Sequence, residues 1–201
     1  MARLLLLAFL APLAFLAPKP PRPLTPRRSA AAASAEAAAG AWAGAREALL
    51  YEDWPGFRAW LSTKPDLEAE DERGWTMLMQ AAEWQKAEAV QLLLEARAFP
   101  GALDAEMSAL HLAARGPIGG GEAEPRILEL LVHHKAHVDA QDATGTTPLM
   151  LAAASGHMST ARCLVRLGAD VTLKDGDGLA AANWSATEHL AQWLTESSTR
   201  T

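Results

Sequence analysis

The chain has 201 residues, of which half are apolar and 21% are charged, and its formal net charge is −6. This is the composition of one soluble domain. Residues 1–35 hold five basic residues and no acidic one, whereas residues 36–201 hold 24 acidic and 13 basic residues. The acidic body disfavours nucleic acid as a partner, because phosphate binding requires a basic surface, and favours a basic protein or peptide. The single cysteine, Cys163, excludes an intramolecular disulfide framework and a cysteine-based zinc cluster.

The first 40 residues have the composition of a targeting segment. Arg3 precedes an almost wholly apolar stretch, 4–16, which is too short to span a bilayer but has the length of the hydrophobic region of a signal peptide. Residues 18–29 are basic, proline-rich and free of acids, and an alanine- and serine-rich tract follows. This order resembles the bipartite presequences of algae with complex plastids. We expect residues 1–40 to be a targeting segment or disordered linker that directs the protein into the secretory pathway. Onward import into a complex plastid, secretion and anchoring in an endomembrane are the alternatives.

A phrase then recurs at intervals of about 33 residues. Its fullest copy, GTTPLMLAAASGH, occupies residues 145–157, and partial copies occupy 74–82 (GWTMLMQAA) and 107–114 (MSALHLAA). The anchor leucines of the copies are Leu78, Leu110 and Leu149, at spacings of 32 and 39. A fixed period of this size predicts stacked supersecondary units with a continuous core between them.

The residues of the fullest copy have local physical roles. Thr147 and Pro148 open a helix, because a threonine side chain caps free N–H groups and proline fits the first helical position. Gly156 and Gly168 suit the left-handed conformation that ends a helix. The phrase and the ending LVRLGAD at 164–170 resemble the ankyrin-repeat family, whose pattern is G-x-T-P-L-H-x-A-A followed by Gly-His and L-L-x-x-G-A-D. The resemblance implies that each unit is a finger, a first helix, a tight turn and a second helix.

We therefore expect an all-α solenoid with short β-hairpin fingers over residues 41–201. Its five units are predicted at 41–73, 74–105, 106–141, 142–174 and 175–201. The terminal units are degenerate, since they face water on one side. In the first unit, Trp54, Pro55 and Gly56 are expected to disrupt the turn between the helices. Six extra residues within Gly116–Pro125 lengthen the corresponding turn of the third unit, either as a tolerated insertion or as a partner-specific loop.

Patterns for catalysis, cofactors and metals are missing from the sequence, so the chain is expected not to be an enzyme. Glycines 119–121 lack the strand and the lysine of a phosphate loop, and Ser155 lacks the context of a nucleophile elbow. His133 and His134 are adjacent at the end of a predicted helix and are expected to point apart. We read them and His137 as solvated side chains, with no metal ligand and no cofactor.

The expected function is binding of a partner protein or peptide by a monomer whose mature body does not span a membrane. The resemblance places the binding surface on the concave side, made of the finger tips and the exposed side of the first helices. The candidate partner-binding residues are Trp75, Gln80, Glu83, Trp84, Met107, Leu112, Arg115, Thr144, Thr146, Ser155, Asp177 and Trp184. The tryptophans either act as interface hot spots or fill gaps in the degenerate units. The alternatives are a chaperone or targeting factor for organelle membrane proteins, and a regulatory fragment of a larger enzyme.

Overall fold

The computed structural model describes residues 42, 44–71, 73–101, 107–117 and 123–199. The predicted targeting segment, 1–40, lies outside the described residues. Among the helices in the described ranges, none combines the length and apolarity that a membrane-spanning helix requires.

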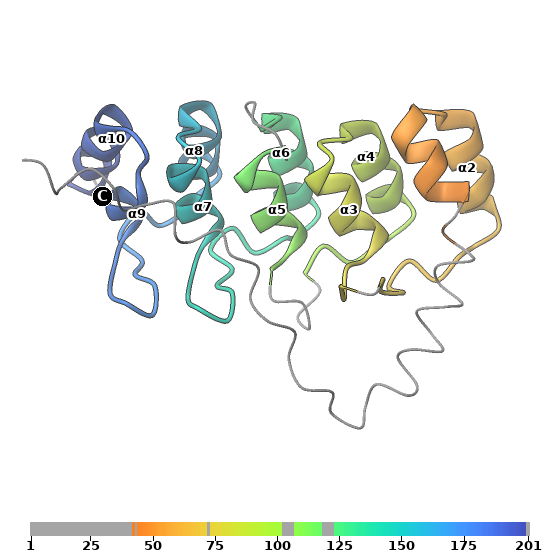
Figure 1. Ribbon diagram of the computed structural model, residues 1–201, viewed down its shortest axis with the longest axis horizontal. Coiled ribbons are helices and arrows are strands. Elements are labelled where there is room, and N and C mark those ends of the chain that lie inside the picture. Colours follow the sequence, from red (N-terminus) through yellow and green to blue (C-terminus); the bar gives the residue numbers. More distant parts are fainter. Residues whose placement is uncertain (1–41, 43, 72, 102–106, 118–122, 200–201) are drawn as a thin grey trace, which may run out of the picture.

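The described chain forms five consecutive helix pairs. Helical residues 44–51 pair with α2 (Trp54–Ser62). The later pairs are α3 (Met77–Glu83) with α4 (Ala87–Glu95), α5 (Ala109–Arg115) with α6 (Pro125–His133), α7 (Pro148–Ala154) with α8 (Met158–Arg166), and α9 (Ala181–Trp184) with α10 (Glu188–Ser198). Each first helix packs against the next, from α3 through α5 and α7 to α9, and α2, α4, α6 and α8 form a second row (Figure 1). The prediction of an all-α solenoid is confirmed.

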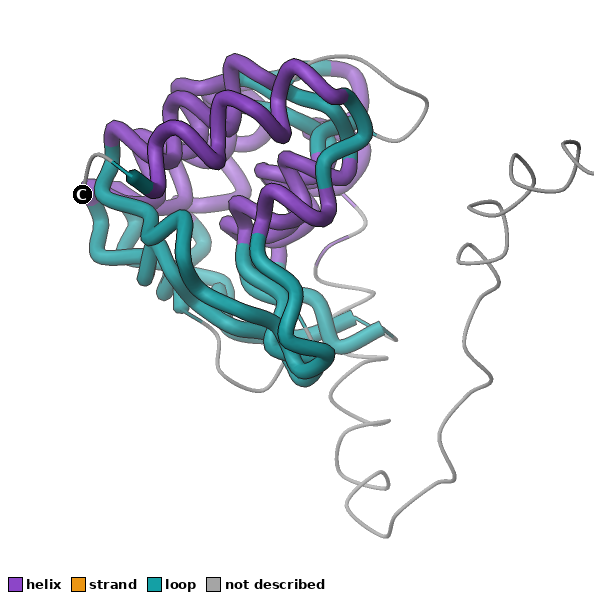
Figure 2. The backbone as a smooth tube through the Cα atoms, turned by 90° about the vertical axis from the view of Figure 1, so that its left-hand side faces the viewer, coloured by secondary structure: helices purple, strands orange, loops and turns teal. Residues whose placement is uncertain are grey.

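The connections between units project from the helices as fingers (Figure 2). Within the described residues they are tight turns without a strand ladder, and one isolated antiparallel bridge joins Lys174 to Ala180. In three fingers, the side chain of an aspartate accepts backbone hydrogen bonds in place of those that strand pairing would supply. In the fourth unit, Asp142 Oδ1 accepts hydrogen bonds from the backbone N–H groups of Thr144 (2.8 Å) and Thr146 (2.9 Å). Asp71 and Asp175 repeat this arrangement.

The finger turn of the fourth unit predicts a large effect of adding one methyl group at Gly145. Its φ is +80°, and an added Cβ would lie 2.9 Å from the backbone nitrogen of Gly176, which donates to the Thr144 carbonyl. We expect Gly145→Ala to lower the free energy of unfolding by about 1–3 kcal/mol. Gly178→Ala is the matched control, since its φ is +79° but no heavy atom lies within 4 Å of the added Cβ. Urea unfolding followed by circular dichroism would measure both; equal losses would show that the contact with Gly176 is unimportant.

Threonine side chains cap the first helices of the second and fourth units. The side chain of Thr76 accepts from Met79 N, and that of Thr147 accepts from Met150 N, each at 3.3 Å. These caps satisfy N–H groups that have no partner within the helix. The fifth unit has Ala180 at the equivalent place, which offers no acceptor, and α9 has only four residues where α7 has seven.

The first unit corrects one sequence-based expectation. The turn between its helices is not disrupted, because Trp54 begins α2 and Asp53 Oδ1 accepts from the backbone N–H of Gly56 at 3.1 Å. Pro55 lies within the first helical turn, where a missing N–H group leaves no acceptor unsatisfied. The predicted position of the insertion agrees with the helix bounds, since residues 116–124 separate α5 from α6 whereas three residues separate α7 from α8.

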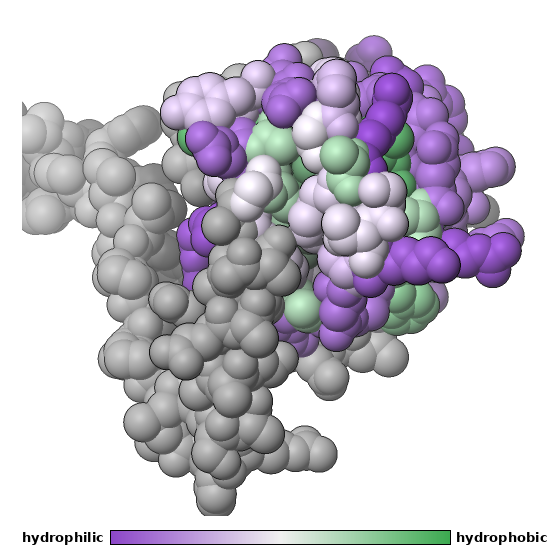
Figure 3. Space-filling view, turned by 90° about the vertical axis from the view of Figure 1, so that its right-hand side faces the viewer, coloured by the Kyte–Doolittle hydropathy of each residue, from purple (hydrophilic) through white to green (hydrophobic). Residues whose placement is uncertain are grey.

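The C-terminal unit closes the solenoid with a largely polar surface. Figure 3 looks onto the opposite end of the solenoid, that of the first unit, where hydrophilic and intermediate residues cover most of the described surface and apolar residues show between them. Exposed residues of α10 include Glu188, Gln192 and Glu196, while Leu190 and Leu194 are buried. A terminal repeat requires such a polar outer face, because no further unit covers it.

Candidate functional site

The predicted partner-binding residues fall into three groups by exposure. The exposed residues are Thr144, Ser155 and Asp177. The partly buried residues are Trp75, Trp84, Met107, Arg115 and Trp184. The buried residues are Gln80, Glu83, Leu112 and Thr146. For these last four the expectation of an exposed side chain was wrong, and whether the twelve residues contact a partner stays a prediction.

Three of these buried residues contact their own finger or the adjacent helices. Gln80 Nε2 donates to Asp71 Oδ2 at 2.9 Å, so its amide lies against the finger of its own unit. The hydroxyl of Thr146 lies 2.8 Å from that of Thr144. Leu112 belongs to α5, which packs between α3 and α7 and has neighbours on both sides.

Glu83 forms a buried ion pair that joins the second and third units. Its carboxylate, with a side chain only 3% exposed, lies 2.5 Å from Arg115 Nη2, and the Arg115 side chain is 37% exposed. Burial raises the pKa of Glu83 above its ordinary value, although Arg115 and Arg73 act in the opposite direction. The backbone carbonyl of Arg115 accepts from Ser155 Oγ at 2.9 Å. Residues of three successive units are thereby connected on one side of the solenoid.

The three candidate tryptophans have different surroundings. The guanidinium of Arg73 lies 4.8 Å from the centroid of the Trp75 ring, in cation–π geometry. Trp184 Nε1 donates to Asp175 Oδ2 at 2.8 Å, so this indole stabilises a finger as the amide of Gln80 does in the second unit. Trp84 ends α3 and packs partly against the core.

His111 connects the third unit to the fourth. Its Nδ1 accepts from the backbone N–H of Ser108 at 3.2 Å, and Nε2 lies 2.9 Å from the carbonyl oxygen of Thr146. These partners fix the neutral tautomer, with the proton on Nε2 donated to Thr146. The imidazole is buried, and burial lowers its pKa below the ordinary value of 6.5.

This lowered pKa predicts a loss of stability in acid. The native state favours neutral His111, whereas the unfolded chain takes up the proton near pH 6.5. The stabilisation from His111 is therefore complete above pH 6.5 and is lost as the pH falls toward the native pKa. We expect the free energy of unfolding of the wild type to fall between pH 7.5 and 5.5 more steeply than that of His111→Gln. Urea titrations of both proteins would measure the difference; parallel pH dependences would contradict this role of His111.

The histidines at the end of α6 do not point apart as expected. The ring centroids of His133 and His134 are 5.6 Å apart, edge to face. The described part of the chain contains no group of three His, Cys, Asp or Glu side chains placed to hold a metal ion.

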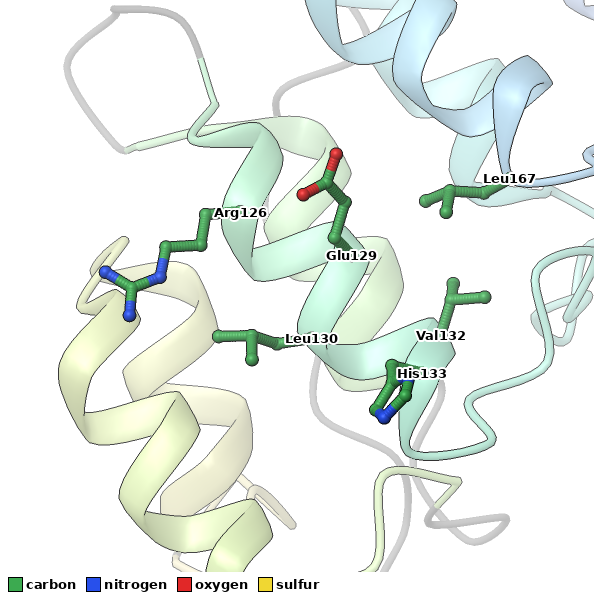
Figure 4. Close-up of a pocket in the computed structure, with 6 residues that line it drawn as sticks. All are labelled: Arg126, Glu129, Leu130, Val132, His133 and Leu167. Carbon is green, nitrogen blue, oxygen red and sulfur yellow. The ribbon is translucent and has the colours of Figure 1, made fainter.

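A shallow hollow of about 430 Å³ lies on α6, beside the end of α8 (Figure 4). Its lining residues are Arg126, Glu129, Leu130, Val132, His133 and Leu167. Arg126 donates to Gln91 Oε1 at 2.7 Å, and Glu129 pairs with Arg166 at 2.7 Å. Because these charged groups are held by neighbouring second helices, the hollow lacks the converging polar groups of a ligand site.

Sequence reasoning missed two exposed apolar residues of the first unit. Leu50 is 57% exposed and Tyr51 is 73% exposed. A shift of 104 residues aligns the first unit with the fourth and places Tyr51 opposite Ser155, which was a candidate. The register of the repeats therefore indicates this position, although the pattern of the family does not specify its side chain.

Comparison with known proteins identifies the repeats. Residues 48–142 and 110–199 each match the family model described as ankyrin repeats (3 copies). Over 73 residues the chain is 37% identical to ADP-ribosylation factor GTPase-activating protein AGD2 of Arabidopsis thaliana, covering 36% of this chain and 9% of that protein. Over 118 residues it is 32% identical to neurogenic locus notch homolog protein 1 of Xenopus tropicalis, covering 58% of this chain and 4% of that protein. The similarity thus spans less than a tenth of each relative. The family match extends across nearly all of the helical pairs, and the chain belongs to the ankyrin-repeat family.

Proposed function

We propose that this chain binds a partner protein or peptide on the concave surface formed by its fingers and first helices, without catalysing a reaction. Ankyrin repeats are protein–protein interaction modules and are typically non-catalytic. Hydrogen bonds and an ion pair between successive units support the concave surface as the binding site.

The observation that carries the proposal is the set of hydrogen bonds between successive units along this surface. Gly176 N donates to the Thr144 carbonyl at 2.8 Å, and Gln141 Nε2 donates to the Lys174 carbonyl at 3.2 Å, so the last two fingers are joined. His111 and Arg115 connect the third unit to its neighbours. A surface ordered before binding loses less conformational entropy when the partner arrives, which favours affinity.

The charge of the chain supports a basic partner. Residues 41–201 contain 23 acidic and 13 basic residues. Opposite charge accelerates association, and salt screens this attraction over a distance of about 10 Å at 0.1 M. We therefore expect binding to weaken as the ionic strength rises.

Affinity purification of the tagged full chain, with identification of the captured protein by mass spectrometry, tests the proposal. We expect Trp75→Ala and Trp84→Ala each to reduce capture about tenfold, a typical loss for an interface aromatic. Trp60→Ala on α2 is the control, since Trp60 is also partly buried but lies in the row of second helices. Circular dichroism would verify that each variant is folded. Capture that is insensitive to both substitutions would rule out this surface.

A chaperone or targeting factor for organelle membrane proteins is the second candidate. It is favoured by four large apolar side chains that are more than 40% exposed, namely Leu50, Tyr51, Phe99 and Leu179. This function requires the purified chain to suppress aggregation of a hydrophobic client protein in a light-scattering assay. The absence of suppression at equimolar concentration would eliminate it.

The remaining proposals concern the ends of the chain. A regulatory segment of a larger enzyme is the third candidate, since AGD2 is by name a GTPase-activating protein and its matched part is 9% of its length. Transcripts that extend the reading frame past Thr201 would support it.

We also propose that residues 1–40 direct the protein into the secretory pathway and onward to a complex plastid. A fluorescent protein fused to residues 1–40 should then leave the cytosol, and a cytosolic signal would contradict the proposal.

A further inference from the structure

The turn that follows the first helix carries residues at equivalent positions in the first four units. Aligned on the fourth unit, Tyr51, Trp84, Gly116 and Ser155 occupy the same position, immediately after or at the end of the first helix. Leu50 occupies the preceding position, where the fourth unit has Ala154. The most regular unit thus has small or polar side chains where the first unit has Leu50 and Tyr51 and the second unit has Trp84.

These apolar side chains lie on neighbouring turns. Lys86 Nζ, two residues after Trp84, pairs with Glu52 Oε1, one residue after Tyr51, at 2.6 Å. The backbone N–H of Trp84 donates to the carbonyl of Gln80, which fixes the end of α3. The ion pair shows that the two turns are neighbours. We call their apolar residues, the exposed Leu50 and Tyr51 and the half-buried Trp84, the N-terminal apolar edge.

Packing of the fold does not account for the N-terminal apolar edge. Leu50 and Tyr51 expose 57% and 73% of their surface, although Leu49 beside them is fully buried. The equivalent residues Ala154 and Ser155 show that the unit can be built with small side chains at these two positions. Contiguous exposed apolar and aromatic side chains are typical of sites that bind another protein.

The charges around the N-terminal apolar edge select the chemistry of the partner. Glu47, Glu52 and Asp53 are all exposed within four residues of Tyr51. The bases nearby are Arg46, which is half-buried, and Lys86, which is already paired with Glu52. Acidic side chains around an apolar centre complement a segment in which basic residues flank an apolar one.

We propose that the N-terminal apolar edge binds a protein segment that carries an apolar or aromatic anchor residue flanked by lysines or arginines. This inference rests on the proposed binding function and adds to it the site and the class of partner. The anchor packs on Leu50, Tyr51 and Trp84, and its flanking cations face Glu47 and Asp53.

Fluorescence anisotropy with the full chain and three labelled twelve-residue peptides tests the proposal. The first peptide has leucine and tryptophan anchors among lysines, the second has the same anchors among glutamates, and the third has the lysines with serine in place of the anchors. We expect the first peptide to bind at least tenfold more tightly than the other two. The double variant Leu50→Ser/Tyr51→Ser should weaken its binding about tenfold or more. Both residues are exposed, so the variant should keep the circular dichroism spectrum of the wild type.

The control variant is Leu179→Ser, at an apolar residue that is 43% exposed on the finger of the last unit. It should change binding of the first peptide less than twofold. Loss of binding in Leu179→Ser with retention in the double variant would overturn the inference and leave the proposed function standing. Equal binding of the lysine and glutamate peptides would overturn the assigned partner chemistry. A wild-type dimer in analytical ultracentrifugation that the double variant dissociates would overturn the assigned partner, because a second copy of the chain would then occupy the edge.

Failure of all three peptides to bind the wild type would also overturn this inference. It would not decide the proposed function, which is tested separately by comparing capture of a partner by the wild type and by Trp75→Ala.

Discussion

Replacing Leu110 by alanine is expected to lower the free energy of unfolding by about 2–5 kcal/mol, the range for removing a buried leucine side chain. Leu110 is fully buried on α5, which packs against α3 on one side and α7 on the other. The cavity would therefore weaken both interfaces of the central unit. Since the stability of a repeat protein is approximately a sum of unit and interface contributions, damage at the centre affects the whole array. Urea unfolding followed by circular dichroism measures the loss.

Leu179→Ala serves as the matched control for this experiment. It removes the same atoms as Leu110→Ala, but from a side chain that is 43% exposed on a finger. Its expected loss is less than about 1 kcal/mol, as for other exposed positions. If both substitutions cost the same, the third unit would not hold the array together. If Leu110→Ala gives two separate unfolding transitions, the units on either side of α5 unfold independently.

The fold could be predicted from the sequence because its signals are local and periodic. Glycine, threonine and proline mark the ends of helices through their own backbone preferences, so Gly145, Thr147 and Pro148 indicate the fourth unit without reference to the rest of the chain. The helices of the first unit keep the same period, since α2 begins at Trp54, 104 residues before the start of α8 at Met158. That agreement depends only on spacing, which survives substitution of the individual residues.

The candidate site was less predictable because burial on its helices depends on distant partners. Gln80 and Glu83 lie on the side of α3 that the repeat pattern leaves to variable residues, and polar side chains there suggest exposure. Their burial follows from Asp71, nine residues before Gln80, and from Arg115, 32 residues after Glu83. Residue type at these positions does not predict the contacts. The position of Gln80 holds Leu151 in the fourth unit and, in the fifth, Trp184, which also donates to its finger aspartate, while the position of Glu83 holds Ala154 in the fourth unit.

Replacing Arg115 by alanine should destabilise the protein by about 3 kcal/mol at pH 8, because it leaves the Glu83 carboxylate buried without its cation. The loss should shrink as the solution is acidified. Burial already raises the pKa of Glu83 above its ordinary value of 4.5, and Arg115 opposes that effect, so the native pKa of Glu83 should be still higher in the variant. A carboxyl group with a raised native pKa takes up a proton on folding, and its destabilisation disappears as the pH falls toward 4.5. Urea unfolding at pH 8 and pH 5 would measure both parts.

Two further variants separate this explanation from simple loss of packing. Arg166→Ala breaks the exposed pair with Glu129 and should cost less than about 1 kcal/mol at either pH. Glu83→Gln removes the buried charge, so the double variant Arg115→Ala/Glu83→Gln should recover most of the loss at pH 8 and show little pH dependence. A loss in Arg115→Ala that is independent of pH, and that Glu83→Gln does not relieve, would mean that the arginine acts through the packing of its aliphatic part. The first result would make the Glu83–Arg115 pair a determinant of how the second and third units align, and hence of the shape of the surface offered to a partner.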